Sequence, residues 1–180
     1  MDFYDIIAQA VGIVAMAFNI LSYQQKGYMR VMTFQLLGSA LFAVNFFMLG
    51  AFVGGFLNTV GIFRALVFMN KKRLHAEHPA WLATFVCLYI LSYILTFTVI
   101  GKPLTLFNGI IELLPVVAMT AVTISFRLSN DRAIRRFGLI SSPSWLVYNI
   151  VNFAVGAMIC EILSLCSIVI GIIRYDLKKR

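Results

Sequence analysis

The first half of this sequence is repeated in its second half. Residues 5–39 align without a gap on residues 108–142. Identical positions include Val14-Ala15-Met16 with Val117-Ala118-Met119, Ser22 with Ser125, Phe34 with Phe137, Leu36 with Leu139 and Ser39 with Ser142. Because a repeat of this kind fixes the number of structural units and relates their orientations, it constrains the fold more than any single motif in the chain.

Composition indicates the environment in which the two copies fold. Of the 180 residues, 61% are hydrophobic and only 12% are charged, and the mean hydropathy is +0.91. One soluble core of this size could not hide so much apolar surface. A helix needs about 20 apolar residues to cross a hydrocarbon core. Segments near this length predict membrane-spanning helices at residues 4–23, 31–49, 52–70, 80–100, 104–126, 137–154 and 157–175.

The repeat determines how these seven predicted helices are grouped. Each copy contains three of them, and two copies in the same orientation require an odd number of helices in between, which the segment 80–100 supplies. We therefore predict an all-α polytopic membrane protein with a 3+1+3 arrangement of parallel repeats. Its parts are a first repeat over residues 1–73, a linker with the fourth helix over 74–102 and a second repeat over 103–180.

The basic residues predict the orientation of the chain. Cytoplasmic loops of membrane proteins are enriched in lysine and arginine. With the N-terminus outside and the C-terminus in the cytoplasm, every lysine and arginine except Lys102 and Arg64 lies on the cytoplasmic side. The net charge of +8 is thus explained by topology and by contact with membrane lipids, and we expect no nucleic-acid partner.

Several segments resemble a bacterial inner-membrane family called YgjV-like, of unassigned function, within the superfamily of SWEET and PQ-loop transporters. The resemblance lies in residues 35–43, in the stretch from Leu49 to Arg64, in residues 142–149 and in residues 161–176. It implies a multi-pass protein of the bacterial inner (plasma) membrane. The duplication, together with the polar groups described below, predicts transport of a small polar solute by alternating access between the two repeats.

Prolines inside the predicted spans are the expected hinges. A proline within a helix removes one backbone hydrogen bond and can kink the chain. SWEET transporters place a proline in each of four helices, whereas this chain has only Pro115 and Pro143 at such positions, opposite Gly12 and Ala40 of the first repeat. We therefore expect hinges at Pro115 and Pro143, and a more strongly bent second half.

Polar side chains within the predicted spans indicate a binding site, because an ionisable or amide group in hydrocarbon is costly. Most of them lie at one depth, roughly 6–9 Å from the outer ends of the spans at 1.5 Å per residue. Glu112, the repeat partner of Gln9, lies slightly deeper. We predict that a small polar solute contacts Gln9, Asn45, Asn58, Glu112, Trp145, Asn149, Glu161 and Ser164.

Arg64 and the two histidines are given no part in this site. Arg64 corresponds to residue 170 in the repeat and so lies about 13 Å along the helix axis from Glu161, too far for a direct salt bridge. We expect its side chain to extend to the cytoplasmic interface instead. His75 and His78 have no further ligands beside them and are interpreted as part of a solvated loop. No metal and no cofactor is predicted.

Two functions from different classes fit these features. The duplication and the polar layer favour a transporter. The alternative is a non-transporting membrane receptor or assembly partner that retains the SWEET-like fold, which the missing prolines of the first repeat favour. An enzyme is not predicted, because no span carries a nucleophile and a base at a suitable spacing. The identity of the solute, its coupling to an ion and self-association into a homo-oligomer stay open.

Overall fold

The computed structural model describes residues 3–48, 52–151 and 155–177. Within these ranges the chain is helical and contains no strand. The prediction of an all-helical chain with seven helices is confirmed. The helices are α1 (Phe3–Ser22), α2 (Tyr28–Met48), α3 (Phe52–Met69), α4 (Pro79–Thr98), α5 (Leu106–Arg127), α6 (Asp131–Val151) and α7 (Val155–Gly171), followed by the π-helical segment η1 (Ile172–Leu177).

Local sequence signals set the start of α4 and of α5. His78 caps α4, because its Nδ1 accepts a hydrogen bond from the Ala80 N–H at 3.2 Å. Pro79 occupies the first turn, where the missing N–H has no helical partner to lose. Thr105 caps α5 in the same way, by accepting from the Asn108 N–H. Both helices therefore begin where a polar residue satisfies backbone groups that the helix leaves free.

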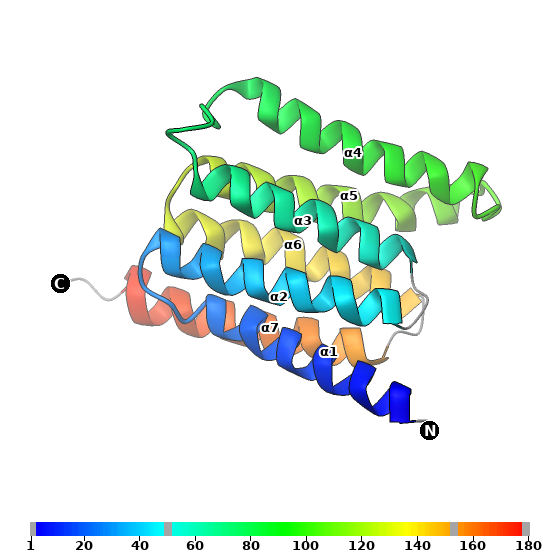
Figure 1. The fold of residues 1–180 in the computed structure, drawn as a ribbon, viewed down its shortest axis with the longest axis horizontal. Coiled ribbons are helices and arrows are strands. Elements are labelled where there is room, and N and C mark those ends of the chain that lie inside the picture. Colours follow the sequence, from blue (N-terminus) through cyan, green and yellow to red (C-terminus); the bar gives the residue numbers. More distant parts are fainter. Residues whose placement is uncertain (1–2, 49–51, 152–154, 178–180) are drawn as a thin grey trace.

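The helices lie side by side, and successive helices run in opposite directions (Figure 1). The α1–α2, α3–α4 and α5–α6 loops lie at the same end of the bundle as the C-terminal segment η1, whereas α1 starts at the other end. We call the first of these the basic end, because residues 23–30, 70–78, 127–136 and 172–177 there include most of the lysines and arginines. The opposite end holds the α4–α5 loop, residues 99–105.

Helix packing follows a regular scheme. In the first half α1 packs on α2 and α2 on α3, and in the second half α5 packs on α6 and α6 on α7. The halves meet where α1 packs on α7 and where α3 packs on α5, while α4 contacts α3 and α5. In the predicted repeat, α1 corresponds to α5 and α3 to α7. If the halves are related in this way, the α1–α7 contact corresponds to the α3–α5 contact.

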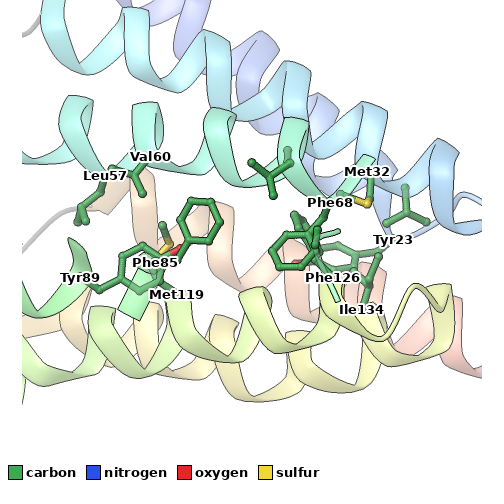
Figure 2. Close-up of a cluster of buried hydrophobic side chains, with 14 of the residues drawn as sticks. Tyr23, Met32, Leu57, Val60, Phe68, Phe85, Tyr89, Met119, Phe126 and Ile134 are labelled. Atoms are coloured by element: carbon green, nitrogen blue, oxygen red, sulfur yellow. The ribbon is translucent and has the colours of Figure 1, made fainter. Parts of the chain in front are cut away.

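A buried aromatic core joins the two halves (Figure 2). Phe68 on α3 packs against Phe85 of α4 and Phe126 of α5, with ring centroids 6.2 Å away in both cases. Aromatic pairs of this kind contribute about 0.5–1.5 kcal/mol beyond the burial of their area. Tyr23 and Ile134 belong to the same buried cluster and extend it toward the basic end.

Large apolar side chains also cover the outside of the bundle, as in a protein surrounded by lipid. Ile13, Phe63 and Ile170 are each more than half exposed. The helices α2, α4, α5 and the segment Met158–Leu177 are long and apolar enough to cross a membrane. Ile6–Ser22 and Gly55–Met69 are shorter apolar helices.

The start of α6 differs most from its predicted span. The apolar segment begins at residue 137, but the helix begins at Asp131. Its first two turns carry charged residues, including Arg135 and Arg136. Hydropathy excludes these residues from the predicted span, although they continue the helix. An acidic first residue is favourable there because it complements the helix dipole. Farther along, α6 continues through Pro143, as α5 continues through Pro115.

Candidate functional site

Arg64 is buried inside the bundle, and the expectation that it extends to the interface is wrong. Only 6% of this residue is exposed. It shares a face of α3 with the buried Leu57 and Phe68, which belong to the aromatic core. Although α3 ends soon afterwards at Met69, this face packs against α4 and α5. The side chain is therefore directed into the protein.

Hydrogen bonds and a ring contact fix the guanidinium of Arg64. Its Nη1 donates to the Tyr89 hydroxyl at 3.1 Å and to the Met119 carbonyl at 3.4 Å. The Tyr89 hydroxyl lies 3.0 Å from Thr123 Oγ1, which donates to the same carbonyl at 2.8 Å. The guanidinium carbon lies 5.1 Å from the centre of the Phe126 ring. Residues of α4 and α5 thus hold this cation in one orientation.

The partners of Arg64 are not among the predicted site residues. Tyr89 and Thr123 are single hydroxyl groups in otherwise apolar segments, and no spacing distinguishes them from other serines, threonines and tyrosines of the chain. A signal was nevertheless present, since an arginine within a span needs acceptors at its own depth. Hydroxyls on the predicted neighbouring helices were the available acceptors.

A second polar group lies between α6 and α7. Glu161 is half-buried and lies near Ser142. Ser164, one turn along α7, is fully buried, and its Oγ has no hydrogen-bond partner among the described residues. Glu161 and Arg64 both lie within electrostatic range of the buried Tyr23 hydroxyl. They form no ion pair with each other in the described ranges.

Glu112 is buried and paired with a lysine from the loop at the opposite end. The Nζ atom of Lys102 lies 2.5 Å from Glu112 Oε1. Tyr148 on α6 also lies beside this carboxylate, and the Trp145 ring packs edge-on against Tyr148 at 5.7 Å between centroids. A buried carboxylate with a lysine partner keeps its charge compensated. Glu112 is therefore the ion-pair partner of Lys102 in this arrangement.

Asn45 connects two helices of the first half. Asn45 is buried and its Nδ2 donates to the Ala8 carbonyl at 2.7 Å, which ties α2 to α1. A Cβ atom on Gly12 would lie 3.0 Å from this amide nitrogen, so the two helices approach closely here. The other positions are Asn149, which is buried on α6, Asn58, which is half-buried on α3 and has an interaction partner, and Gln9, whose side chain lies outside the part that the structure describes.

Polar bonds between the two halves gather at the basic end. Gln24 Nε2 donates to the Ser167 carbonyl at 2.6 Å and to its Oγ at 2.9 Å, and this Oγ donates to the Ile20 carbonyl at 2.7 Å. On the other side of the interface, the Tyr28 hydroxyl donates to the Phe126 carbonyl at 2.6 Å. These bonds join the end of α1 to α7 and the start of α2 to α5.

An arginine cluster forms a further connection at the basic end. Arg135 is 1% exposed and binds Asp176 through Nε at 3.1 Å and Nη2 at 2.6 Å. Its Nη2 also donates to Asp131 at 3.1 Å, and its Nη1 donates to the Gln25 carbonyl at 3.3 Å. Burial acts to raise the pKa of Asp131, but hydrogen bonds from the Gly27 N–H and from Arg135 outweigh it and lower that pKa. We call these five residues the Arg135 cluster.

The two histidines lie in the loop between α3 and α4. His75 and His78 line a shallow depression together with Lys71, Lys72 and Glu77. In the described ranges, no group of three or more histidine, cysteine, aspartate or glutamate side chains is placed to hold a metal ion. The depression lies outside the bundle and shares no residue with the groups around Arg64 and Glu161.

Comparison with known proteins identifies the family. A family model described as "Imp-YgjV: Bacterial inner membrane protein" matches residues 6–179, which include nearly the whole chain. No curated protein and no solved structure matches. The match confirms the resemblance to the YgjV-like family, and it agrees with the apolar helices of the bundle. The chain therefore belongs to the Imp-YgjV family and is a multi-pass protein of the bacterial inner membrane.

Proposed function

We propose that this protein carries a small polar solute across the inner membrane by alternating access between two three-helix repeats, α1–α3 and α5–α7. In this proposal α4 links two repeats of the same orientation in a SWEET-like fold. The N-terminus lies outside and the basic end lies in the cytoplasm, where its lysines and arginines contact lipid headgroups.

The observation that carries the proposal is the pair of contacts between the halves. α1 packs on α7 and α3 packs on α5, and the sequence repeat exchanges these two contacts. Repeats related by an axis along the membrane normal are a known basis for rigid-body rocking around a central site. Two equivalent interfaces allow the halves to close one end of the bundle while they open the other.

The distribution of polar bonds supports one state of such a cycle. The bonds from Gln24 to Ser167 and from Tyr28 to Phe126 hold the halves together at the basic end. Near the opposite end, Asn45 bonds to Ala8 within the first half, and Lys102 of the α4–α5 loop bonds to Glu112 of the second half. Neither bond joins the two halves. An arrangement closed toward the cytoplasm fits this distribution, and the bonds at the basic end would break when the carrier opens inward.

Transport can be tested with the purified full chain in liposomes. We expect the protein to exchange at least one radiolabelled small polar solute from a panel of amino acids, organic acids and polyamines. Glu161→Gln should lower the exchange rate at least about tenfold, because it removes an ionisable carboxyl group from the proposed solute path. The matched control is Glu77→Gln, which makes the same change on an exposed loop residue.

Two results would contradict transport. The first is that no solute of the panel is bound or moved by a folded protein. The second is that the protein binds a solute but does not carry it across the membrane, and that a thiol reagent reaches Asn149→Cys only from the outer side, whatever the condition. That second result would favour a receptor or assembly partner with a transporter-like fold.

A further inference from the structure

Arg64 has one edge of its guanidinium without a partner. All of its hydrogen bonds within the described residues leave from Nη1. Its Nε is buried and has no hydrogen-bond partner there. Nε–H and the adjacent Nη2–H point in the same direction and form the fork that binds both oxygens of a carboxylate. The orphaned Nε therefore marks a binding edge that the protein itself does not use.

The same chain shows how this edge is normally occupied. Arg135 holds Asp176 with Nε and Nη2, at 3.1 Å and 2.6 Å. Both arginines are almost completely buried, at 6% exposure for Arg64 and 1% for Arg135. Arg135 thus has a carboxylate on its fork, whereas the described residues place none on the fork of Arg64.

A guanidinium cannot avoid this problem by losing its proton, because arginine is not deprotonated in proteins. A buried charge is costly unless it is paired and hydrogen-bonded. The partners of Arg64 are a hydroxyl, a carbonyl and a ring face, none of which carries a negative charge. Among the described residues, no carboxylate forms an ion pair with this guanidinium, so an anion could bind it directly.

The guanidinium of Arg64 is held by side chains of α4 and α5. Tyr89 and Phe126 orient it, so that little freedom is lost when an anion binds. A Cβ atom added to Gly61 would lie 3.9 Å from Nη2 and 3.4 Å from Ser39 Oγ, in ordinary van der Waals contact with both. Gly61 therefore lies beside Nη2, on the same helix as Arg64.

We propose that the Nε and Nη2 edge of Arg64 binds a carboxylate group of the transported solute, which makes the solute a small organic anion. This assignment rests on the transport function proposed above and specifies its substrate class. Arg64 is 6% exposed in the present arrangement. The anion therefore reaches it when the α3–α5 contact opens, and its charge then compensates the guanidinium.

Binding is tested by thermal unfolding of the purified full chain in detergent. The probes are lactate and succinate, their neutral counterparts lactamide and succinamide, inorganic phosphate and choline. We expect a carboxylate to raise the unfolding midpoint by about 5–10 °C at a hundredfold excess over its Kd, and the matching amide to leave it unchanged. If neither carboxylate shifts the midpoint, or if phosphate or choline does so more strongly, the assignment of a carboxylate is overturned.

Variants separate a binding role from a structural one. Arg64→Lys keeps the charge but loses the fork, and should weaken carboxylate binding about tenfold. Arg64→Gln should abolish it while leaving the unliganded protein at least as stable, because an uncompensated buried charge is removed. Arg30→Gln, the same change at an exposed arginine, should bind like the wild type. Unchanged carboxylate binding in Arg64→Gln would overturn the proposal.

Exchange measurements in liposomes distinguish this proposal from that of transport. Carboxylate binding that depends on Arg64, without exchange across the membrane, would contradict transport and retain the anion site. Exchange of a neutral or cationic solute at equal rates in the wild type and in Arg64→Lys would retain transport and overturn the anion site.

Discussion

At the scale of single residues, two buried arginines differ in the charge of their partners. Arg135 has Asp131 and Asp176 beside it, so its charge is compensated within the basic end. Among the described residues, the hydrogen-bond and ring partners of Arg64 are all neutral. The first arginine can therefore serve as a structural connection, whereas the second is the one to which we assign an anion.

The Arg135 cluster predicts a dependence of stability on pH. Hydrogen bonds from Gly27 and Arg135 lower the pKa of Asp131 below its ordinary value of 3.8, against the effect of its burial. A carboxyl with a lowered pKa stabilises the fold fully above the ordinary value, and this contribution is lost as the pH falls through the lower one. We expect Asp131→Asn to be less stable than the wild type at neutral pH. The two proteins should converge on acidification.

Thermal unfolding of both proteins in detergent, from about pH 7 to about pH 3, checks this expectation. The informative quantity is the difference between the two midpoints, because other carboxyl groups titrate in both proteins alike. A difference that stays constant over the whole range would show that the ionised Asp131 contributes nothing to stability.

At the scale of helices, the sequence predicts well which residues form a helix, but it predicts poorly which way the polar side chains of that helix point. The sequence predicts this helix at residues 52–70 and α3 lies at Phe52–Met69, because the apolar run ends where Lys71, Lys72 and Arg73 begin. Hydropathy does not say which way a single polar side chain points. Arg64 was therefore placed at the interface, and Asn45 was grouped with other amides although its partner is the Ala8 carbonyl.

The same limit applies to the candidate site. Depth along a helix placed Glu112 and Glu161 in one layer, but their partners depend on helix rotation and on loops. Lys102, which pairs with Glu112, comes from a loop that the periodicity of the spans does not describe. Tyr89 and Thr123 became identifiable as partners of Arg64 only when α4 and α5 were placed against α3.

The contact between α7 and the end of α1 predicts the effect of one methyl group. A Cβ atom on Gly171 would lie 2.5 Å from the Tyr23 carbonyl oxygen and 3.0 Å from Arg135 Cδ. Backbone cannot move away cheaply, so Gly171→Ala should destabilise the protein by about 1–3 kcal/mol despite the better helix propensity of alanine. Reversible unfolding in mixed micelles with increasing denaturant measures this free energy.

Gly109→Ala is the matched control, since it adds the same methyl group to a helix where the nearest atom, Tyr93 Oη, would lie at 3.4 Å. That variant should be as stable as the wild type or slightly more stable. Equal stability of Gly171→Ala and Gly109→Ala would mean that α7 is not packed closely on the end of α1.

At the scale of the whole molecule, charge and topology agree. Successive helices run in opposite directions, so the loops at residues 70–78 and 99–105 lie at opposite ends of the bundle. The first loop contains Lys71, Lys72 and Arg73, whereas the second contains a single basic residue, Lys102. Retention of lysine and arginine on the cytoplasmic side then favours one orientation of the entire bundle.

Cysteine labelling in a protein without Cys87, Cys160 and Cys166 tests this orientation. Leu104→Cys, at a position that is 76% exposed in the α4–α5 loop, should react with a membrane-impermeant maleimide in intact spheroplasts. Lys72→Cys, which is exposed at the basic end, should react only after permeabilisation. The reverse pattern would place the basic end outside. Labelling of both positions in intact spheroplasts would mean that the bundle inserts in two orientations, and the bonds of Gln24 and Tyr28 could then not form a gate that always faces the cytoplasm.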